Sequence, residues 1–473
     1  MHFKSILLFI CFILTKAQCV EEKSYSELKE CNLGALAEEI ASYEHVVKNI
    51  IKYTLKGPFK GKTYNELSKF LDKFGPRMSG TQTHEQSIDH VVDLTKEEMI
   101  YDVVTKNVQV PHWERGNETL TMRQPRVKKM ALLGLGQTVS TPPEGITAEV
   151  IVVSNFTMLE EMPDEQIKGK IVLFNPKFTT YRETVQYREH GATKASAKGA
   201  IAALVRSITP FSINSPHTGH QTYGDNVTKI PAAAITIEDT DLIQRIRDRG
   251  QKVEIHLQID SIHHHPKISK NMIVTLPGTE GRDKAVVISA HTDSWDVGQG
   301  AIDDGGGLFI TWAATVIIKQ LRLRPRRPIR AIYFTAEEFG LIGAKAYLKG
   351  RCHDTEDINF IMESDEGTFT PLGLAVGGTQ EARCIIAEVL KLFKFINATT
   401  LIEEDNPGSD ITVLTSVGVP GASLYTDNKK YFWFHHSEGD TINVLNPHEL
   451  DLCSGYWAAL AYVIADLSVD IPR

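Results

Sequence analysis

The second half of the chain alternates short apolar runs with longer segments that have the spacing of helices. The apolar runs predict buried strands at residues 285–290, 330–335, 358–362 and 421–425. The segments between and after them predict helices at residues 305–321, 338–349, 379–394 and 447–467. Strands that alternate with helices predict an α/β fold, in which a mainly parallel mixed sheet is covered by helices.

The pattern changes between residues 115 and 265. Short strand-like runs follow one another there, at residues 148–153, 171–174, 200–205, 230–237 and 253–259. Turn residues, including Pro142, Pro143 and Gly145, separate them. This pattern predicts a separate β-rich domain at 115–265. It would be inserted into the α/β domain, whose N-terminal part lies at 51–114 and whose main part lies at 266–473.

The N-terminus has the pattern of a secretory signal peptide at residues 1–19. Lys4 precedes an uninterrupted apolar run at 6–14, and small residues follow up to Cys19. The run is far shorter than the roughly 20 residues that span a bilayer, so no membrane span is predicted. The charged segment at 20–50 has a helical pattern, and two interpretations stay open for it: a propeptide or an ordinary first helix.

Composition excludes one class of partner and agrees with the secretory route. The chain has 473 residues, is 42% hydrophobic and carries a formal net charge of −8, without the basic footprint of a nucleic-acid binder. Asn-x-Ser/Thr sequons occur at Asn117, Asn155, Asn226 and Asn397. Together with the signal pattern they predict a secreted protein that passes through the ER and Golgi.

The cysteines do not define the fold. Beyond the signal region the chain has Cys31, Cys352, Cys384 and Cys453, which are too sparse for a disulfide scaffold. Their pairing stays open. None forms a Cys-x-x-Cys pair, so a thiolate zinc site is not predicted.

Acidic and histidine residues follow three predicted strands of the α/β domain and the aromatic run at 431–434 near the end of the chain. They are His291, Asp293, Asp303, Glu337, Glu338, Asp365, His435 and His436. Binding sites of such sheets form at the carboxyl ends of the strands. Because carboxylates repel one another unless cations neutralise them, the cluster predicts a metal site. Imidazole and carboxylate suit zinc, and a carboxylate could bridge two ions about 3.5–4 Å apart.

Two other histidine groups resemble metal motifs less well. His84 and His90 are six residues apart, whereas a zincin helix needs a spacing of four, so a solvated helix is predicted there. His263, His264 and His265 lie at the join of the two predicted domains, where a linker is favoured over adventitious metal binding. No G-x-S-x-G elbow occurs, which argues against a serine hydrolase.

Three stretches resemble the di-zinc exopeptidase family. They are residues 291–300 (His-Thr-Asp-Ser-Trp-Asp-Val-Gly-Gln-Gly), 335–338 (Thr-Ala-Glu-Glu) and 432–437 (Phe-Trp-Phe-His-His-Ser). The resemblance extends over nearly the whole chain, and the insert at 115–265 resembles the protease-associated domain of the same group. It implies the di-zinc exopeptidase fold, a zinc peptidase domain at 266–473, a homodimer, and the lysosome as an alternative destination.

The resemblance also implies a ligand set for two Zn²⁺ ions per chain. His291 and Asp365 would bind one ion, Glu338 and His436 the other, and Asp303 would bridge both. In the family pattern the last histidine ligand precedes Ser-x-x-Asp-Thr, which selects His436 over His435.

The remaining roles come from the same resemblance. Glu337 would be the general base that activates a water molecule between the two ions. Asp293 would orient His291, as carboxylates commonly do for imidazole ligands. The peptide that matches Asp303–Asp304 is cis in this family.

The predicted function is a zinc-dependent exopeptidase that hydrolyses dipeptides or short peptides, by resemblance a carboxypeptidase. An aminopeptidase on the same fold stays open, because the ligands do not separate the two. A receptor-like relative without catalysis is a third interpretation, and the complete ligand set argues against it. An acyl transferase related to glutaminyl cyclases would not be expected to carry the insert.

Overall fold

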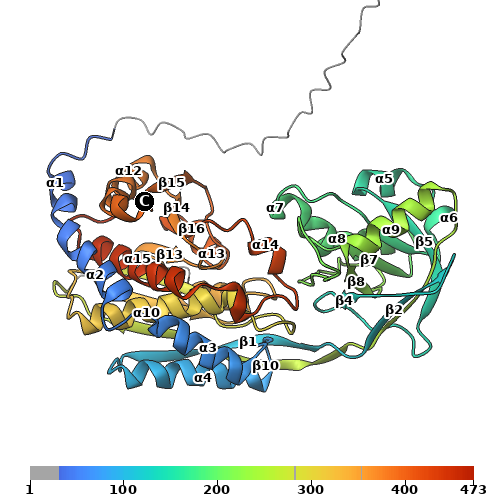
Figure 1. Ribbon diagram of the computed structural model, residues 1–473, viewed down its shortest axis with the longest axis horizontal. Coiled ribbons are helices and arrows are strands. Elements are labelled where there is room, and N and C mark those ends of the chain that lie inside the picture. Colours follow the sequence, from blue (N-terminus) through green and yellow to red (C-terminus); the bar gives the residue numbers. More distant parts are fainter. Residues whose placement is uncertain (1–30, 282–283, 353) are drawn as a thin grey trace, which may run out of the picture.

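The protein is built from two domains, each formed around its own eight-stranded sheet (Figure 1). The computed structural model describes residues 31–281, 284–352 and 354–473. The predicted signal peptide at 1–19 and the start of the segment at 20–50 lie outside the described residues. The two long strands β1 (Val103–Glu114) and β10 (Ile262–Leu276) pair with each other and run from one domain into the other.

The sheet of the larger domain is mixed, with parallel strands at its centre. Its order is β1, β10, β12 (Ile329–Phe334), β11 (Ala285–His291), β13 (Ile358–Glu363), β16 (Gly421–Thr426), β14 (Pro371–Gly377) and β15 (Thr400–Glu403). The pairs β12–β11, β11–β13 and β13–β16 are parallel, and β16–β14 is antiparallel. The α/β prediction is therefore confirmed, and the carboxyl ends of the central strands meet at one edge.

Helices cover both faces of this sheet. One face packs against α10 (Gly306–Gln320) and α15 (Pro447–Asp466), with α2 (Glu44–Lys56), α3 (Lys62–Phe74), α4 (Gln82–Glu97) and α12 (Gln380–Leu390) around them. The other face packs against α11 (Ile342–Gly350) and α13 (Thr412–Thr415). Within the described residues, the segment Ala301–Gln320 is long and apolar enough to cross a membrane, but its apolar part, residues 301–318, is buried inside the protein. It is a core helix, apolar on all sides because protein surrounds it.

The strands of the second sheet lie between Glu118 and Ile259. Their order is β3 (Lys128–Met130), β2 (Glu118–Gln124), β9 (Glu254–Ile259), β5 (Ile146–Val153), β6 (Ile171–Phe174), β7 (Ala202–Arg206), β8 (Ala232–Ile235) and β4 (Leu132–Gly134). The β-rich description was incomplete, because helices pack on both sides of this sheet. They are α5 (Phe156–Glu161), α6 (Asp164–Ile167), α7 (Tyr181–Thr184), α8 (Gln186–Ala197) and α9 (Ile237–Asp248). In α8 the apolar face consists mainly of Ala192, Ala195 and Gly191, which gives little hydrophobic signal.

Two predicted helices have different bounds in the structure. The helix predicted at 338–349 begins only at Ile342, because residues 337–341 form a turn in which Gly340 and Leu341 have positive φ. The helix predicted at 379–394 ends at Leu390 and continues as a 3-10 helix, η2 (Lys391–Ile396).

The helix around His84 was predicted correctly as a helix and wrongly as solvated. His84 is fully buried, and its Nε2 lies 2.9 Å from the hydroxyl of Thr292, next to the strand end that carries His291. His84 therefore packs against the segment that carries His291 and does not face solvent.

The start of the described chain is part of the main core. Helix α1 (Ala35–Ser42) and α2 contribute the buried side chains of Ile40, Val47 and Ile50. A disulfide joins Cys31 to Cys384 on α12. Cys352 and Cys453 are free thiols, so among the residues that the structure describes a single disulfide fastens the start of the chain and does not form a scaffold.

Candidate active site

The side chains predicted as metal ligands come together at the carboxyl edge of the large sheet. They reach it from five segments: His291 from the end of β11, Asp303 from η1 (Ala301–Gly305), Glu338 from the turn after β12, Asp365 from the loop after β13, and His436 from the loop after α14 (Tyr431–Phe434). Parallel strands end at the same edge of a sheet, and this brings residues that are far apart in the sequence into one cluster.

One half of the cluster is built around His291. Its Nε2 lies 3.1 Å from Oδ1 of Asp365 and 3.2 Å from Oδ1 of Asp303. Its other ring nitrogen, Nδ1, lies 3.0 Å from the backbone oxygen of Asp293, which fixes the orientation of the ring. The hydroxyl of Ser409 donates to the second oxygen of Asp365 at 2.6 Å. One imidazole and two carboxylates thus converge on a single point.

The other half is built around His436 in the same way. Its Nε2 lies 3.1 Å from Oδ2 of Asp303 and 3.1 Å from Oε2 of Glu338. Asp303 therefore presents Oδ1 to one half and Oδ2 to the other. This is the arrangement expected of a carboxylate that bridges two cations. The peptide between Asp303 and Asp304 is cis, as the resemblance implied.

Of the two adjacent histidines, His436 has the better ligand geometry. His435 stacks on it and reaches only Asp303, at 3.4 Å. His436 contacts two carboxylates, and its Nδ1 lies 3.2 Å from the backbone oxygen of Thr218. A partner of this kind on the second ring nitrogen is typical of imidazoles that bind metal.

The inserted domain holds the segment that carries His436. The backbone N–H of Thr218 donates to the oxygen of His436 at 2.9 Å, and Nδ1 of His217 donates to the oxygen of His435 at 2.5 Å. Both His217 and Thr218 are buried. The insert therefore completes the site that the larger domain builds.

Asp293 has contacts beyond the one predicted. Its carboxylate accepts the backbone N–H groups of Glu337 at 3.1 Å and Glu338 at 3.3 Å, and its Oδ1 lies 3.7 Å from Nδ1 of His291. The backbone oxygen of Asp293, at 3.0 Å from the same ring nitrogen, lies closer to His291 than the carboxylate does. The carboxylate also fixes the turn that separates the two glutamates, so that Glu338 points into the cluster.

Two further side chains position the loop of Asp303. Asp440 accepts the backbone N–H groups of Ala301 at 2.8 Å and Ile302 at 2.7 Å. The buried guanidinium of Arg77 donates to the oxygens of Gln299 and Gly300 at 2.7 and 3.0 Å. These bonds hold the loop against the segment that follows α14 and the segment between α3 and α4.

The electrostatics of the cluster fit a bound metal. Burial, reinforced by the charges of Asp365 and Glu338, raises the pKa of Glu337 well above its usual range. Burial, reinforced by Asp303, raises the pKa of Glu338 to about 7. Oε1 of Glu338 is buried without a hydrogen-bond partner. Burying several carboxylates side by side costs free energy, and bound cations would offset that cost. The imidazole and carboxylate groups of the cluster are ligands that suit zinc.

The cluster lies in a cleft of about 630 Å³ between the two domains. The larger domain contributes Glu337, Asp365 and His436 to its wall, and the insert contributes Tyr181 and Arg188. A cleft of this size can hold a short peptide. Small-molecule sites commonly have such volumes and lie between domains.

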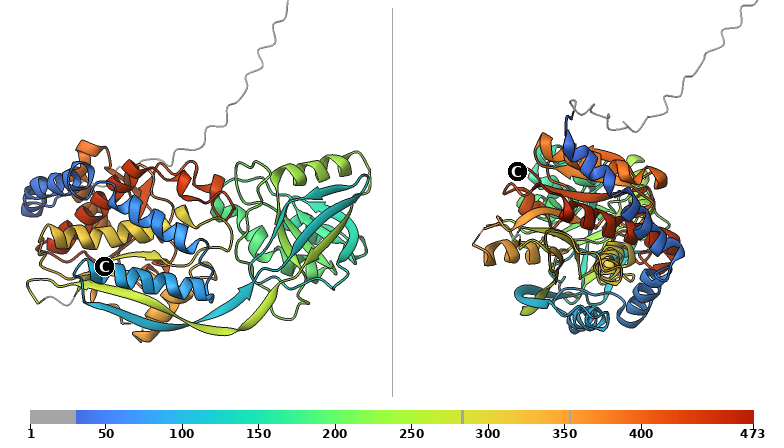
Figure 2. Two further views of the ribbon diagram at one scale, coloured as in Figure 1. Left: turned by 60° about the horizontal axis from the view of Figure 1, so that its bottom comes forward. Right: turned by 90° about the vertical axis from the view of Figure 1, so that its left-hand side faces the viewer.

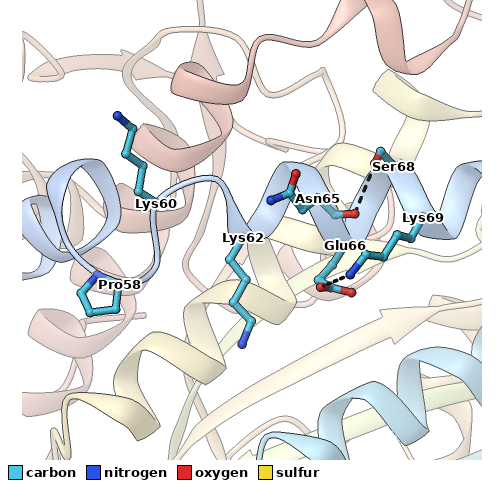
Figure 3. Close-up of a pocket in the computed structure, with 7 residues that line it drawn as sticks. All are labelled: Pro58, Lys60, Lys62, Asn65, Glu66, Ser68 and Lys69. Atoms are coloured by element: carbon cyan, nitrogen blue, oxygen red, sulfur yellow. Dashed lines mark hydrogen bonds and ion pairs between the residues drawn. The ribbon is translucent and has the colours of Figure 1, made fainter.

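A second hollow, beside the start of α3, has no comparable chemistry (Figure 3). It is lined by Pro58, Lys60, Lys62, Asn65, Glu66, Ser68 and Lys69, and it shares no residue with the cleft. Lys69 pairs with Glu66 at 2.9 Å and Lys62 pairs with Glu98, so two of its three lysines are already neutralised.

Sequence reasoning missed the residues that support the ligands from a distance. Arg77 and Thr218 lie outside every motif, and no signal in the chain marks them. Asp440 belongs to the Ser-x-x-Asp-Thr pattern after His436, so its position was noted but not its role.

The comparisons with known proteins agree with this geometry. Residues 271–461 match Peptidase family M28. Carboxypeptidase Q of Xenopus laevis is 45% identical over 92% of each chain. The crystal structure of a peptidase M28 precursor from Shewanella amazonensis SB2B superposes with a TM-score of 0.88 at 29% identity, covering 92% of this chain and 99% of that one. A zinc aminopeptidase from Bacillus subtilis, with a TM-score of 0.63 at 21% identity over 88% and 99% of the chains, shares the fold.

Fold and site together define a metallopeptidase, a hydrolase of peptide bonds. Within that class, the chain belongs to peptidase family M28, in the group of the carboxypeptidases Q. The predicted family is confirmed.

Proposed function

We propose that the protein is a di-zinc carboxypeptidase that acts on dipeptides or short peptides. The observation that carries this proposal is the placement of Asp303, whose two carboxylate oxygens face two separate histidine and carboxylate groups. His291 and Asp365 would hold one Zn²⁺, Glu338 and His436 the other, and Asp303 both.

In the proposed reaction two adjacent glutamates have different roles: Glu338 is a zinc ligand and Glu337 is the general base. Zinc bound in the cluster would lower the pKa of a water molecule and polarise the scissile carbonyl. Glu338 faces His436, whereas Glu337 lines the cleft and takes part in no contact within the cluster. Glu337 accepts the proton of the attacking water and returns it to the leaving amine. Asp293 keeps the roles separate by fixing both backbone N–H groups.

The cations of the cleft favour a carboxypeptidase over an aminopeptidase. Arg188 and Lys345 both line it, and neither forms an ion pair with a carboxylate of the described chain. Arg188 is buried and is held by the hydroxyl of Tyr181 at 2.8 Å. A free α-carboxylate would complement this wall of the cleft, because a carboxylate and a guanidinium or ammonium group form charge-assisted hydrogen bonds.

A panel of dipeptides tests this assignment. Purified protein with zinc should hydrolyse a dipeptide with a free C-terminus and should lose activity when that C-terminus is amidated. Acetylation of the N-terminus should reduce turnover much less. The opposite order, with the amidated peptide cleaved and the acetylated one refused, would identify an aminopeptidase on the same fold.

The adjacent histidines give a second test. We expect His436→Ala to lose one zinc ion and nearly all turnover, because His436 contacts both Asp303 and Glu338. His435→Ala is its matched control and should keep the zinc content, since His435 reaches only Asp303, at 3.4 Å. Zinc content and turnover of both variants are measured in one buffer. Zinc loss in His435→Ala alone would show that His435, and not His436, is the zinc ligand.

The first described helices should remain in the mature enzyme. Ile40, Val47 and Ile50 are fully buried in the main core, and burial of three such side chains stabilises a fold by roughly 5–9 kcal/mol. That is comparable to the whole stability of a domain. We therefore propose that any processing of the segment at 20–50 occurs before Cys31. N-terminal sequencing of secreted, active protein checks this, and an active form that begins beyond Cys31 would refute it.

The secretory route and the dimer rest on the family and the sequence. The four sequon asparagines, Asn117, Asn155, Asn226 and Asn397, are all exposed, which glycosylation requires. We propose a secreted glycoprotein, with the lysosome as an alternative destination, that forms a homodimer. Light scattering of the purified protein measures the oligomeric state.

A further inference from the structure

A third group of side chains that could hold a metal ion lies outside the cleft. It lies on the two-stranded ribbon of β1 and β10, which runs between the two domains (Figure 2). It consists of His112 and Glu114 on β1 and His264 on β10. Among the described residues, the other groups of this kind both contain Asp303 and belong to the cleft. This group has no part in the proposed hydrolysis.

Strand geometry places the three side chains on one face. His112 and Glu114 are two residues apart on β1, and side chains two apart in a strand point the same way. His264 is the direct partner of His112 across the ladder. Trp113, between the two β1 ligands, points to the other side and is buried in a cluster with Trp295 and Met78. The backbone thus fixes which atoms can meet.

The three side chains lie close enough together to share one small cation. Nε2 of His112 lies 3.0 Å from Oε1 of Glu114, and Nε2 of His264 lies 3.3 Å from Oε2 of the same carboxylate. One ligand atom of each residue lies within 4.8 Å of the others. Zinc binds nitrogen and oxygen ligands at about 2.0–2.2 Å in tetrahedral geometry, which places neighbouring ligand atoms about 3.3 Å apart.

The group is open to solvent on one side. The side chains of Glu114 and His264 are 48% and 38% exposed, while that of His112 is 11% exposed. Nδ1 of His112 is buried without a hydrogen-bond partner, and its Nε2 faces the carboxylate of Glu114. With three protein ligands, a water molecule would fill the fourth position of a tetrahedral zinc ion.

The backbone ladder between β1 and β10 is interrupted next to this group. The register of the β1–β10 ladder shifts between Val110 and His112. Pro111 and Pro266 lie at this shift, and proline has no N–H to donate to a ladder. A cation held by both strands would replace the missing backbone bonds at this place. Because the ribbon carries the insert, whose residues line the cleft, such a cross-link would restrict how far the two domains can separate.

We propose that His112, Glu114 and His264 form a third, structural zinc site that pins the ribbon between the two domains. The site is independent of which peptide bond the enzyme cleaves, and it is tested by metal content rather than by turnover.

The test uses the full chain with its cleft already loaded with zinc. Equilibrium dialysis against Zn²⁺ should load one more ion per chain into the wild type than into His264→Ala or Glu114→Gln. The matched control is His265→Ala, which removes the neighbouring imidazole of the same exposed strand and should keep the extra ion. Added Zn²⁺ should raise the melting temperature of the wild type and of His265→Ala, but not of His264→Ala, because an ion that binds only the folded state stabilises it.

Equal zinc uptake by wild type and His264→Ala would overturn the proposal. So would an equal loss in His265→Ala, which would show that any exposed imidazole of this strand binds zinc. Neither outcome bears on the ions in the cleft, whose ligands are untouched in all three variants.

Discussion

Glu337→Gln should lower turnover by about 10³–10⁴-fold while the zinc content stays unchanged. Loss of a general base costs about 10²–10⁴-fold, and the upper end applies because the same residue also returns the proton to the leaving amine. The amide keeps the size of the side chain, and Glu337 makes no contact with His291, Asp303 or His436 that the substitution would break. Turnover and zinc content are measured on the same preparation.

Glu338→Gln is the matched control, because it makes the same chemical change one residue later. Glu338 contacts His436 at 3.1 Å, so this variant should lose one zinc ion and should bind a product-like inhibitor more weakly. Glu337→Gln should still bind that inhibitor. Equal zinc loss in both variants, or near-normal turnover in Glu337→Gln, would mean that the wrong glutamate has been assigned as the base.

Asp303→Asn should have the largest effect on metal content. An amide offers one weak oxygen ligand in place of two charged ones, and Asp303 is the residue that faces both His291 and His436. Both ions should weaken, and activity should fall by more than the roughly 100-fold that loss of an outer-shell partner costs.

The fold of Asp303→Asn should survive, because the substitution removes one of several buried like charges. Glu366→Gln is the control for metal content, since Glu366 lines the same cleft and lies outside both ligand groups. Retention of two zinc ions by Asp303→Asn would contradict the bridging role.

The sequence predicts the larger domain well because each of its central strands is a continuous apolar run. The strands β11, β12, β13 and β16 lie within one residue of their predicted bounds. The strands β14 and β15 were not predicted, because Gly373 and Gly377 interrupt the apolar pattern of β14 and none of the four residues of β15 is fully buried. The start of helix α11 was predicted too early, because the turn with positive φ that precedes this helix leaves no mark in the hydrophobic pattern.

The ligands could be predicted because exposure of strand ends to solvent does not explain so many acidic and histidine residues in succession. The residues that hold the ligands in place could not be predicted. Thr218 acts through its backbone oxygen, so its identity carries no signal, and the sequence cannot show that the insert folds back onto His436. The ribbon group illustrates the same limit. His264 was visible in a histidine run, but its partners His112 and Glu114 lie about 150 residues earlier and meet it only through strand pairing.

The central claim is that two zinc ions lie on either side of Asp303. Diffraction data collected from crystals of the full-length protein at the zinc absorption edge test it most directly. The account predicts two anomalous peaks in the cleft, about 3.5–4 Å apart. One should lie among His291, Asp303 and Asp365, and the other among Asp303, Glu338 and His436. A single peak in the cleft of zinc-loaded, active protein, or none, would contradict it.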